Sequence, residues 1–369
     1  MSKKKLTRVE LRKNRAKPPR GNDLTRAFHD DADKAAEASS GERVRAKGDV
    51  SRHRTIAADA ADGMPAVDPA ACRPGRVLRV HGLYSYVERE DGTVVRCVVR
   101  RLLKTLATDE RSVVTTGDRV WVREADGEGT IERVEPRHGV LTRASRRREH
   151  VLVANVDQLA VVVSLVNPDL KPHLIDRYIA AAAKGGLAPV VCLNKADLAN
   201  PVDLQPLVGA YSRLGIPTLL TSVVTGLGID RLRQRLRNRA TVFSGQSGVG
   251  KSSLLNAVQP GLGLRVKEVS DVNNKGKHTT TTAELIRLET GGWVVDTPGV
   301  RQLQLWDTRP EEVEGYFREF RPFVPLCGFP DCTHTHEHKC AVKDAVARGR
   351  ISDRRYHSYI GMFNGVAEE

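Results

Sequence analysis

Residues 245–252 read Gly-Gln-Ser-Gly-Val-Gly-Lys-Ser, the pattern Gly-x-x-x-x-Gly-Lys-Ser of a phosphate-binding loop. Glycines let the backbone turn sharply and point N–H groups at a phosphate, and a following helix adds the positive end of its dipole. The context fits, because a short apolar strand precedes the loop at 241–244 and an amphipathic segment follows it at 251–258. This strand, loop and helix predict a nucleotide-binding α/β domain.

The residue types in this loop predict how a nucleoside triphosphate is held. We expect the Lys251 amine to reach the β- and γ-phosphates and the Ser252 hydroxyl to ligate Mg²⁺. A glycine-rich turn with a chance Lys-Ser pair is the alternative, and the flanking strand and helix disfavour it. The remaining phosphate contacts are expected from Gly245, Gln246, Ser247, Gly248, Val249, Gly250 and Ser253.

A second motif, Asn194-Lys195-Ala196-Asp197, follows an apolar strand at residues 189–193. The Asp197 carboxylate can accept hydrogen bonds from N1–H and the N2 amine of guanine, whereas adenine would leave it unpaired. Asn194 is expected to hold the loop and the N7 edge of the base, and the Lys195 stem to cover one face of the ring. Alone the motif is a weak signal, but beside a phosphate-binding loop it predicts a guanine nucleotide.

A third contact with the base is expected after the strand predicted at residues 218–221. Ser222 and Val223 come next in the chain, and we expect their backbone N–H groups to face guanine O6. Because O6 is a hydrogen-bond acceptor, backbone donors at this strand end would add to the selection of guanine.

The segment 296–299, Asp-Thr-Pro-Gly, follows a further apolar strand. Asp296 is expected to bind Mg²⁺ through water, and the N–H of Gly299 to sense the γ-phosphate. A simple β-turn is the alternative for a sequence of this type. The presence of the phosphate-binding loop favours the nucleotide interpretation.

The polar segment 273–282 reads Asn-Asn-Lys-Gly-Lys-His-Thr-Thr-Thr-Thr and has no apolar period. It is typical of a switch loop that Mg²⁺ and the γ-phosphate order, and we expect Thr280 or Thr281 to ligate the Mg²⁺. Val300 stands where many GTPases have a water-orienting glutamine, and valine cannot hydrogen-bond. His278 is therefore the candidate catalytic residue, with a solvated loop histidine as the alternative.

The order of the motifs indicates how the domain is wired. The base-reading segment comes before the phosphate-binding loop, whereas an ordinary small GTPase has it after the switches. Strands alternate with helices from residue 158 onwards, which predicts a mostly parallel, doubly wound sheet. We therefore expect a circularly permuted GTPase domain at residues 141–307, entered through a basic linker at 143–148.

The sequence before this domain has a pattern typical of β-strands. Five short strand candidates, punctuated by glycines, lie between residues 73 and 140 and predict a small Greek-key barrel of the OB type. Periodicity does not separate an OB barrel from an SH3-like one, and a barrel that is only a spacer is the alternative to one that contacts nucleic acid. Residues 1–72 are predicted to be a basic, largely disordered tail.

Charge and hydropathy restrict the partners. The formal net charge is +14 and the isoelectric point is about 9.7, which favours nucleic acid as the macromolecular partner. The apolar runs are too short to span a bilayer and no signal peptide is visible, so we expect a cytoplasmic protein, a monomer, without a membrane partner.

The last 62 residues, 308–369, are predicted to form a helical zinc-binding domain. Three of the six cysteines cluster there with a histidine as Cys-x4-Cys-x-His-x5-Cys, which suits tetrahedral, structural Zn²⁺. A catalytic metal and a chance cluster are the alternatives. The other cysteines are scattered, which indicates a reducing compartment rather than a disulfide framework. The expected ligands are Cys327, Cys332, His334 and Cys340.

Together these motifs resemble the RsgA/YjeQ family of circularly permuted bacterial ribosome-biogenesis GTPases, over about residues 73–369. The resemblance implies an OB domain, a permuted GTPase domain and a zinc domain. It also implies GTP hydrolysis stimulated by the small (30S) ribosomal subunit, binding to ribosomal RNA, and a role late in the maturation of that subunit. Finally, it implies that His278 is catalytic and that the Cys3His set holds the zinc.

Two other functions remain open at this point. One is a permuted GTPase of large-subunit assembly, a group that tends to have Pro-Asn where this chain has Ser247-Gly248 and to lack the barrel and the zinc module. The other is an RNA-binding scaffold that uses GTP as a structural ligand and does not hydrolyse it.

Overall fold

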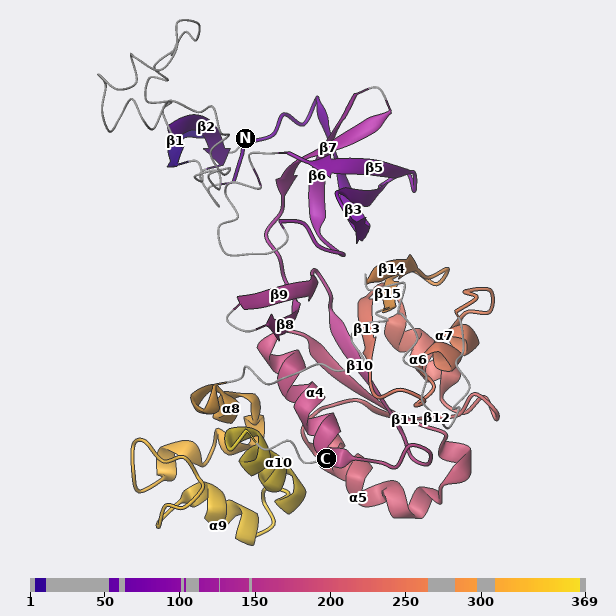
Figure 1. Ribbon diagram of the computed structural model, residues 1–369. Coiled ribbons are helices and arrows are strands. Elements are labelled where there is room, and N and C mark those ends of the chain that lie inside the picture. Colours follow the sequence, from indigo (N-terminus) through magenta and orange to yellow (C-terminus); the bar gives the residue numbers. More distant parts are fainter. Residues whose placement is uncertain are drawn as a thin grey trace, which may run out of the picture.

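Figure 1 shows a β-barrel at one end of the molecule, an α/β domain in the middle and a small helical domain at the other end. This computed structural model describes residues 64–100, 103, 113–125, 127–145, 148–264, 283–296 and 309–365, with the backbone alone at 4–10, 53–59, 143–145, 148–149 and 296. The three parts confirm the predicted fold class.

Five strands form the barrel. They are β3 (Cys72–His81), β4 (Tyr84–Arg89), β5 (Val94–Val99), β6 (Arg119–Ala125) and β7 (Glu128–Val134). Their order is β3-β4-β5-β7-β6, and β6 pairs with β3 to close the barrel. β5 and β7 run parallel while their neighbours are antiparallel, which is a Greek-key order and not a simple meander. This strand order resolves the open choice in favour of the OB type.

The barrel interior is built from the alternate residues of these strands. Val77, Val87 and Ile131 are fully buried there. Because successive strand residues point to opposite faces, the same strands present arginines and tyrosines outside. The Arg79 guanidinium lies 4.3 Å from the centre of the Tyr86 ring on this outer face.

Two further strands lie in the segment predicted to be largely disordered. β1 (Lys4–Glu10) and β2 (His53–Asp59) pair in antiparallel register. The residues between them lie outside the described ones, so disorder of the tail as a whole stays a prediction.

The central sheet has six strands. They are β10 (Gln158–Ser164), β11 (Ala188–Asn194), β12 (Thr218–Thr221), β13 (Ala240–Ser244), β14 (Glu284–Arg287) and β15 (Trp293–Asp296). The order is β12-β11-β10-β13-β15-β14, parallel throughout except for the edge strand β14. All seven residues of β10 are buried, as expected for a Val-rich strand covered on both faces.

Helices cover both faces of this sheet, as a doubly wound fold requires. α4 (Pro172–Lys184) and α5 (Pro201–Arg213) pack on one face, and α6 (Ile229–Leu236) and α7 (Lys251–Val258) on the other. Two separate apolar clusters result, one under each pair of helices. The sheet between them fixes the loops at its edges.

A hairpin occupies the place of the predicted basic linker, so that prediction is wrong. β8 (Leu141–Ser145) and β9 (Arg148–Val153) pair in antiparallel register. Leu141 and Val153, one from each strand, are buried in the core under α4, and this burial stabilises the hairpin.

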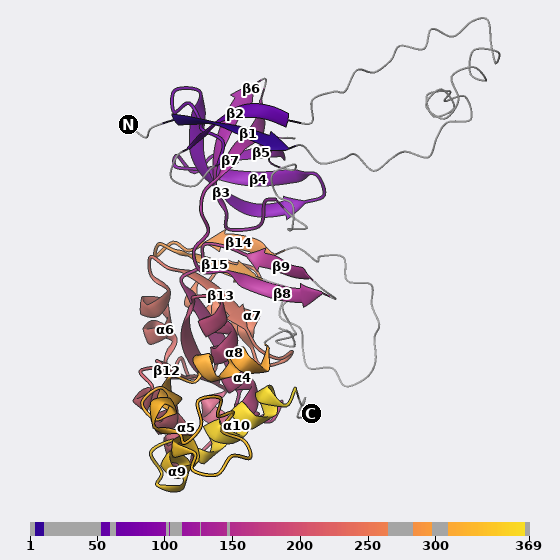
Figure 2. The ribbon, with the colours of Figure 1, turned by 90° about the vertical axis from the view of Figure 1, so that its left-hand side faces the viewer.

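The barrel and the central sheet are joined edge to edge. Glu284 of β14 pairs with Arg79 of β3, so a single sheet of 11 strands runs through both parts. Figure 2 shows β14 between the barrel and the rest of the central sheet. The Thr116 hydroxyl also donates to the Ala283 carbonyl at 2.9 Å, just before β14 begins.

The C-terminal part is helical and has its own aromatic core. It contains α8 (Pro310–Tyr316), the short 3-10 turns η2 (Arg318–Phe320) and η3 (Val324–Leu326), α9 (Ala341–Ala347) and α10 (Asp353–Phe363). Phe317, Phe320 and Tyr359 are buried together, with ring centres 5.0–5.5 Å apart. Throughout the described residues, no helix is both long enough and apolar enough to cross a membrane.

Candidate nucleotide site and metal centre

The predicted nucleotide motifs meet at one edge of the central sheet. Parallel strands bring their carboxyl ends together, and each motif begins where one of these strands ends. β11 ends at Asn194, β12 at Thr221, β13 at Ser244 and β15 at Asp296. Permutation has changed the order along the chain and has left the motifs side by side in space.

The phosphate-binding loop connects β13 to α7, as predicted. Gly245, Gly248 and Gly250 have φ values of +148°, +78° and +92°. Residues that carry a Cβ rarely adopt such values. An added Cβ at Gly245 would lie 2.0 Å from the Val162 carbonyl oxygen, and one at Gly250 would lie 2.5 Å from Asn194 Nδ2. Glycine is therefore required at both positions by conformation and by space.

Lys251 and the serines after it begin α7. The Lys251 amine donates to the carbonyl oxygens of Gly245 and Gln246, at 2.8 and 2.7 Å, so it lies across the loop. Ser252 and Ser253 follow in the first helical turn and are half-buried. No side chain caps α7, and the positive end of a helix dipole at this place favours an anion.

Asn194 connects the base-reading and phosphate-binding motifs. Its side chain is buried; Nδ2 donates to the Val249 carbonyl at 2.8 Å, and Oδ1 accepts from the Thr221 hydroxyl at 3.1 Å. One amide group thus ties the end of β11 to the phosphate loop and to β12. This contact is structural, and it comes in addition to the predicted contact with the base.

The two other base-reading residues lie on a single turn. Lys195 has a left-handed φ of +60°, and its amine donates to the Asn167 carbonyl. Asp197 is in the following 3-10 turn, η1 (Ala196–Leu198), and its side chain is exposed. The carboxylate is therefore accessible to a ligand at this edge of the sheet.

The structure distinguishes between the two backbone N–H groups predicted to donate to guanine O6. The backbone N–H of Ser222 donates to the Leu227 carbonyl at 3.0 Å, and the Ser222 hydroxyl accepts from the Thr225 N–H at 3.2 Å. Val223, the next residue, is 41 % exposed. The N–H of Val223 is the better candidate donor to O6.

Several predicted residues fall outside the described ones. His278, Thr280, Thr281 and Gly299 belong to this group, and of Asp296 only the backbone at the end of β15 is described. Their roles stay predictions.

The metal cluster predicted from the Cys-x4-Cys-x-His-x5-Cys pattern is assembled. The ligand atoms of Cys327, Cys332, His334 and Cys340 all lie within 4.8 Å of one another. His334 Nδ1 is 3.3 Å from Cys340 Sγ and 3.6 Å from Cys327 Sγ, and the Sγ atoms of Cys327 and Cys340 are 4.0 Å apart. Sulfurs bound tetrahedrally at about 2.3 Å would be about 3.8 Å apart. These residues could therefore hold a metal ion.

The surroundings of His334 fix its orientation. The other ring nitrogen, Nε2, lies 3.1 Å from a carboxylate oxygen of Glu314 on α8, and the imidazole is fully buried. The hydroxyls of Tyr356 and Tyr359 donate to the backbone carbonyls of His334 and Thr333, both at 2.7 Å. A carboxylate that binds the outer nitrogen orients the ring so that Nδ1 could bind a metal ion.

Sequence reasoning missed Glu314. No motif includes this residue, which lies in α8 and is separated from the first cysteine ligand by the turns η2 and η3. The usable signal was chemical: a metal-binding histidine usually donates its second N–H to a carboxylate, and α8 is rich in glutamate.

The fold and these sites define a circularly permuted GTPase with an OB barrel and a Cys3His cluster. The sequence profile of the RsgA GTPase family matches residues 134–306. A relative from Thermotoga petrophila, called small ribosomal subunit biogenesis GTPase RsgA, is 40% identical over 296 residues, which cover 79% of this chain and 96% of the relative. The chain therefore belongs to the RsgA GTPase family and is a GTPase.

Other comparisons agree. A relative of the same name from Sodalis glossinidius is 39% identical over 80% of this chain and 86% of its own length. The crystal structure of YjeQ from Thermotoga maritima matches with a TM-score of 0.68 and 37% identity, over 81% of this chain and 99% of that one. YloQ, described as a circularly permuted GTPase, matches with a TM-score of 0.63 and 28% identity, over 82% and 98% of the two chains.

Proposed function

We propose that this protein is a GTP-hydrolysing assembly factor that binds ribosomal RNA and acts in late maturation of the small (30S) ribosomal subunit. The similarity to relatives named for small-subunit biogenesis, over 96% of the length of one of them, is the observation that carries the ribosomal part. In this proposal the small subunit stimulates hydrolysis, and the protein acts as a monomer in the cytoplasm.

The guanine site is formed by the three strand ends around Asn194. Asp197 accepts from N1–H and N2 of guanine, Lys195 covers the ring, and the N–H of Val223 meets O6. The exposure of Asp197 and Val223 at one edge of the sheet supports this assignment. GTP and GDP share this contact, so the base does not distinguish them.

The phosphates and Mg²⁺ are bound by the loop and the switches. Lys251 reaches the β- and γ-phosphates, Ser252 and Thr280 or Thr281 ligate Mg²⁺, and Asp296 binds it through water. The N–H of Gly299 senses the γ-phosphate. His278 orients the attacking water, a task that Val300 cannot perform.

The Cys3His cluster holds one structural Zn²⁺. Three thiolates and an imidazole would fill all four positions of a tetrahedral Zn²⁺ and leave none for a substrate. When bound, the ion supplies the cross-link that ties η3, the loop 327–340 and the start of α9 together. The ligand spacing and the carboxylate of Glu314 behind His334 support zinc over harder cations.

Turnover of GTP, measured alone and with purified small or large ribosomal subunits, tests this function. We expect slow intrinsic hydrolysis and a clear stimulation by small subunits only. Stimulation by large subunits alone would favour a large-subunit assembly GTPase. Hydrolysis in none of the three conditions, with GTP still bound, would identify a scaffold with a structural nucleotide.

A further inference from the structure

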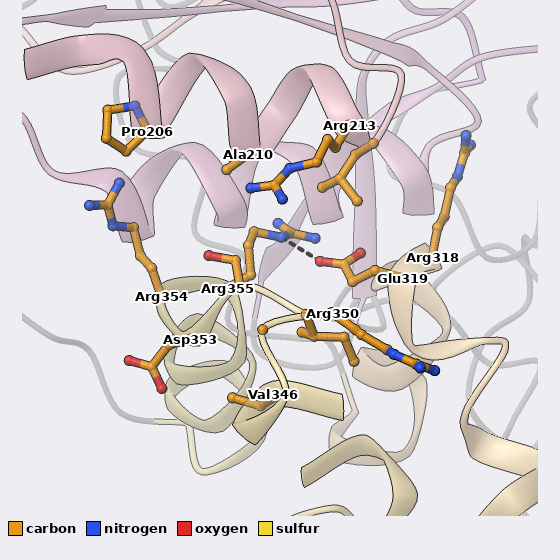
Figure 3. A pocket seen from close by; sticks show the side chains of 14 residues that line it. Pro206, Ala210, Arg213, Arg318, Glu319, Val346, Arg350, Asp353, Arg354 and Arg355 are labelled. Atoms are coloured by element: carbon orange, nitrogen blue, oxygen red, sulfur yellow. Dashed lines mark hydrogen bonds and ion pairs between the residues drawn. The ribbon is translucent and has the colours of Figure 1, made fainter. Parts of the chain in front are cut away.

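An arginine-rich groove separates α5 of the GTPase domain from the helical domain. Its volume is about 840 Å³, and five of the residues that line it are arginines. They come from three places: the end of α5, the η2 turn, and the turn and helix at α10. Figure 3 shows Arg213 of α5 reaching toward Arg355 across this groove. The five are Arg213, Arg318, Arg350, Arg354 and Arg355.

The floor of the groove is neutralised and fixed. Arg355 is buried and donates to Glu319 at 2.7 Å and to Asp176 of α4 at 2.9 Å. These two carboxylates compensate its charge, so Arg355 is not available for a ligand. The other four arginines are exposed around this floor.

The acidic side chains that line the groove do not neutralise the charge of the four exposed arginines. Glu319 is paired with Arg355, so Asp353, which lies 3.2 Å from His357, is the exposed carboxylate among the residues that line the groove. Arg213 donates from Nε to the Gly209 carbonyl of its own helix at 3.4 Å, and its guanidinium reaches into the groove (Figure 3). Four exposed arginines against one exposed carboxylate leave the rim positive.

The start of α10 adds an independent attraction for anions. Ser352 occupies the N-cap position of this helix of 11 residues and lines the groove. Its side chain makes no hydrogen bond to the first turn of the helix. The first N–H groups of a helix have no partner within the helix and carry the positive end of its dipole. Backbone donors and guanidinium groups thus converge on one place, the combination that binds phosphate.

The lining also indicates which phosphate compound fits. None of the described residues that line the groove is aromatic, so it offers no stacking surface for a base. We propose that this groove binds the sugar-phosphate backbone of an RNA strand, which bridges α5 and the helical domain and is read without regard to sequence. This inference rests on the proposed function, since the RNA concerned is that of the small subunit.

The test compares two double variants in binding to purified small subunits over a salt series. Arg213→Ala with Arg354→Ala removes two rim charges. Arg231→Ala with Arg237→Ala is the matched control, because these exposed arginines lie in the first turn and at the end of α6, on the opposite face of the sheet. Loss of two phosphate contacts should weaken binding about tenfold at low salt and lower the slope of log K against log salt by about 2.

The control pair should keep the parent slope. Arg213→Lys with Arg354→Lys, which keeps the charges, should recover most of the affinity. Unchanged affinity for a fluorescent GDP in all variants shows that they are folded. Equal slopes for the Arg213/Arg354 alanine variant and the parent would overturn the proposal.

A second arm separates RNA from a small phosphate compound. If calorimetry shows that inorganic phosphate binds the parent below millimolar concentration but not the groove variant, while both bind RNA alike, the groove serves a small ligand and the proposal is wrong. The salt series is repeated on purified rRNA from both subunits. A parent that does not prefer small subunits would contradict the proposed function, while the effect of the groove variant on rRNA would still be measurable.

Discussion

Asn194 shows how one side chain can serve two motifs that are distant in sequence. Its amide satisfies the Val249 carbonyl and the Thr221 hydroxyl in a buried place. A buried polar group that loses its partner costs more than a hydrogen bond contributes, because it stays desolvated. The geometry of the phosphate loop therefore depends on the residue that begins the base-reading motif.

Replacing Asn194 by alanine should both destabilise the domain and weaken nucleotide binding. We expect a loss of about 1–3 kcal/mol in the free energy of unfolding, since two buried groups lose their partner. Urea unfolding and titration with a fluorescent GDP measure the two effects. Asn200→Ala is the control, because Asn200 only caps α5 at an exposed site; a GDP affinity reduced equally in both variants would contradict this role for Asn194.

Asp197→Asn should change the preferred base. An amide in place of the carboxylate can donate to the 2-oxo group of xanthine and no longer accepts from both guanine donors. Competition of GTP, XTP and ATP for the site measures the preference, and we expect XTP to gain on GTP by at least tenfold. Asp203→Asn, at an exposed position in the first turn of α5, should leave the preference for GTP unchanged.

His278→Ala should slow hydrolysis and spare binding. Loss of a residue that orients or deprotonates water typically costs about 10²–10⁴-fold in rate. Single-turnover hydrolysis with small subunits present is the measurement, with His336→Ala as a control because that imidazole is exposed. Lys251→Ala should instead abolish nucleotide binding. A His278 variant with the parent rate would remove this residue from the mechanism.

Among the secondary-structure elements, those set by local pattern were predictable. The strand at 218–221 and the helix at 251–258 have the predicted ends, because apolar period and glycine punctuation determine both. α10 was not predicted, since Arg355 and Ser358 face the buried Asp176 and interrupt the apolar stripe. β14 was missed because its four residues have no period of their own and are stabilised by β15 and β3.

The candidate site shows the same division. Each motif could be recognised from the sequence because its residues are neighbours in the chain. The contacts between motifs, such as Asn194 with Val249 and His334 with Glu314, join residues that only the fold brings together. A single sequence does not reveal which distant residues are paired in this way.

Chelation tests the proposed zinc, because loss of a bound ion should release the loop between η3 and α9. Cys97 and Cys192 are buried, and burial raises the pKa of each thiol to about 12, so neither forms a reactive thiolate at neutral pH. We expect thiol titration after chelation to report three additional reactive groups, those of Cys327, Cys332 and Cys340. An unchanged thiol count, with no zinc found by metal analysis, would contradict a structural metal.

At the level of domains, a buried cluster around Asp176 joins the helical part to the GTPase part. Asp176 is fully buried and accepts from Tyr211 of α5 at 2.9 Å, Arg355 of α10 at 2.9 Å and Ser358 of α10 at 2.6 Å. Burial alone lowers the pKa of Arg355, but the carboxylates of Asp176 and Glu319 outweigh it, so the guanidinium stays charged. This cluster positions the helical domain against α4 and α5.

Breaking this cluster should loosen the helical domain. Removing one partner of a buried ion pair typically costs about 3–5 kcal/mol, so Arg355→Ala should increase hydrogen exchange across α10 and α8. Replacing Asp176 and Arg355 together by apolar residues should recover much of the loss. Asp230→Ala, which breaks the exposed pair between Asp230 and Arg233, should cost less than about 1 kcal/mol. Equal exchange in the Arg355 variant and the parent would contradict the docking role.

The position of β10 in the central sheet has a consequence for synthesis on the ribosome. Its two sheet neighbours are β11 and β13, and β13 is translated only after α4, β11, α5, β12 and α6. In the nascent chain, one edge of this apolar strand therefore stays unpaired while about 75 further residues are made, at roughly 5–20 residues per second. An unpaired apolar edge is a site for wrong pairing. Permutation thus makes β10 the strand that waits for its neighbour, whereas in the unpermuted order β13 would already have been made.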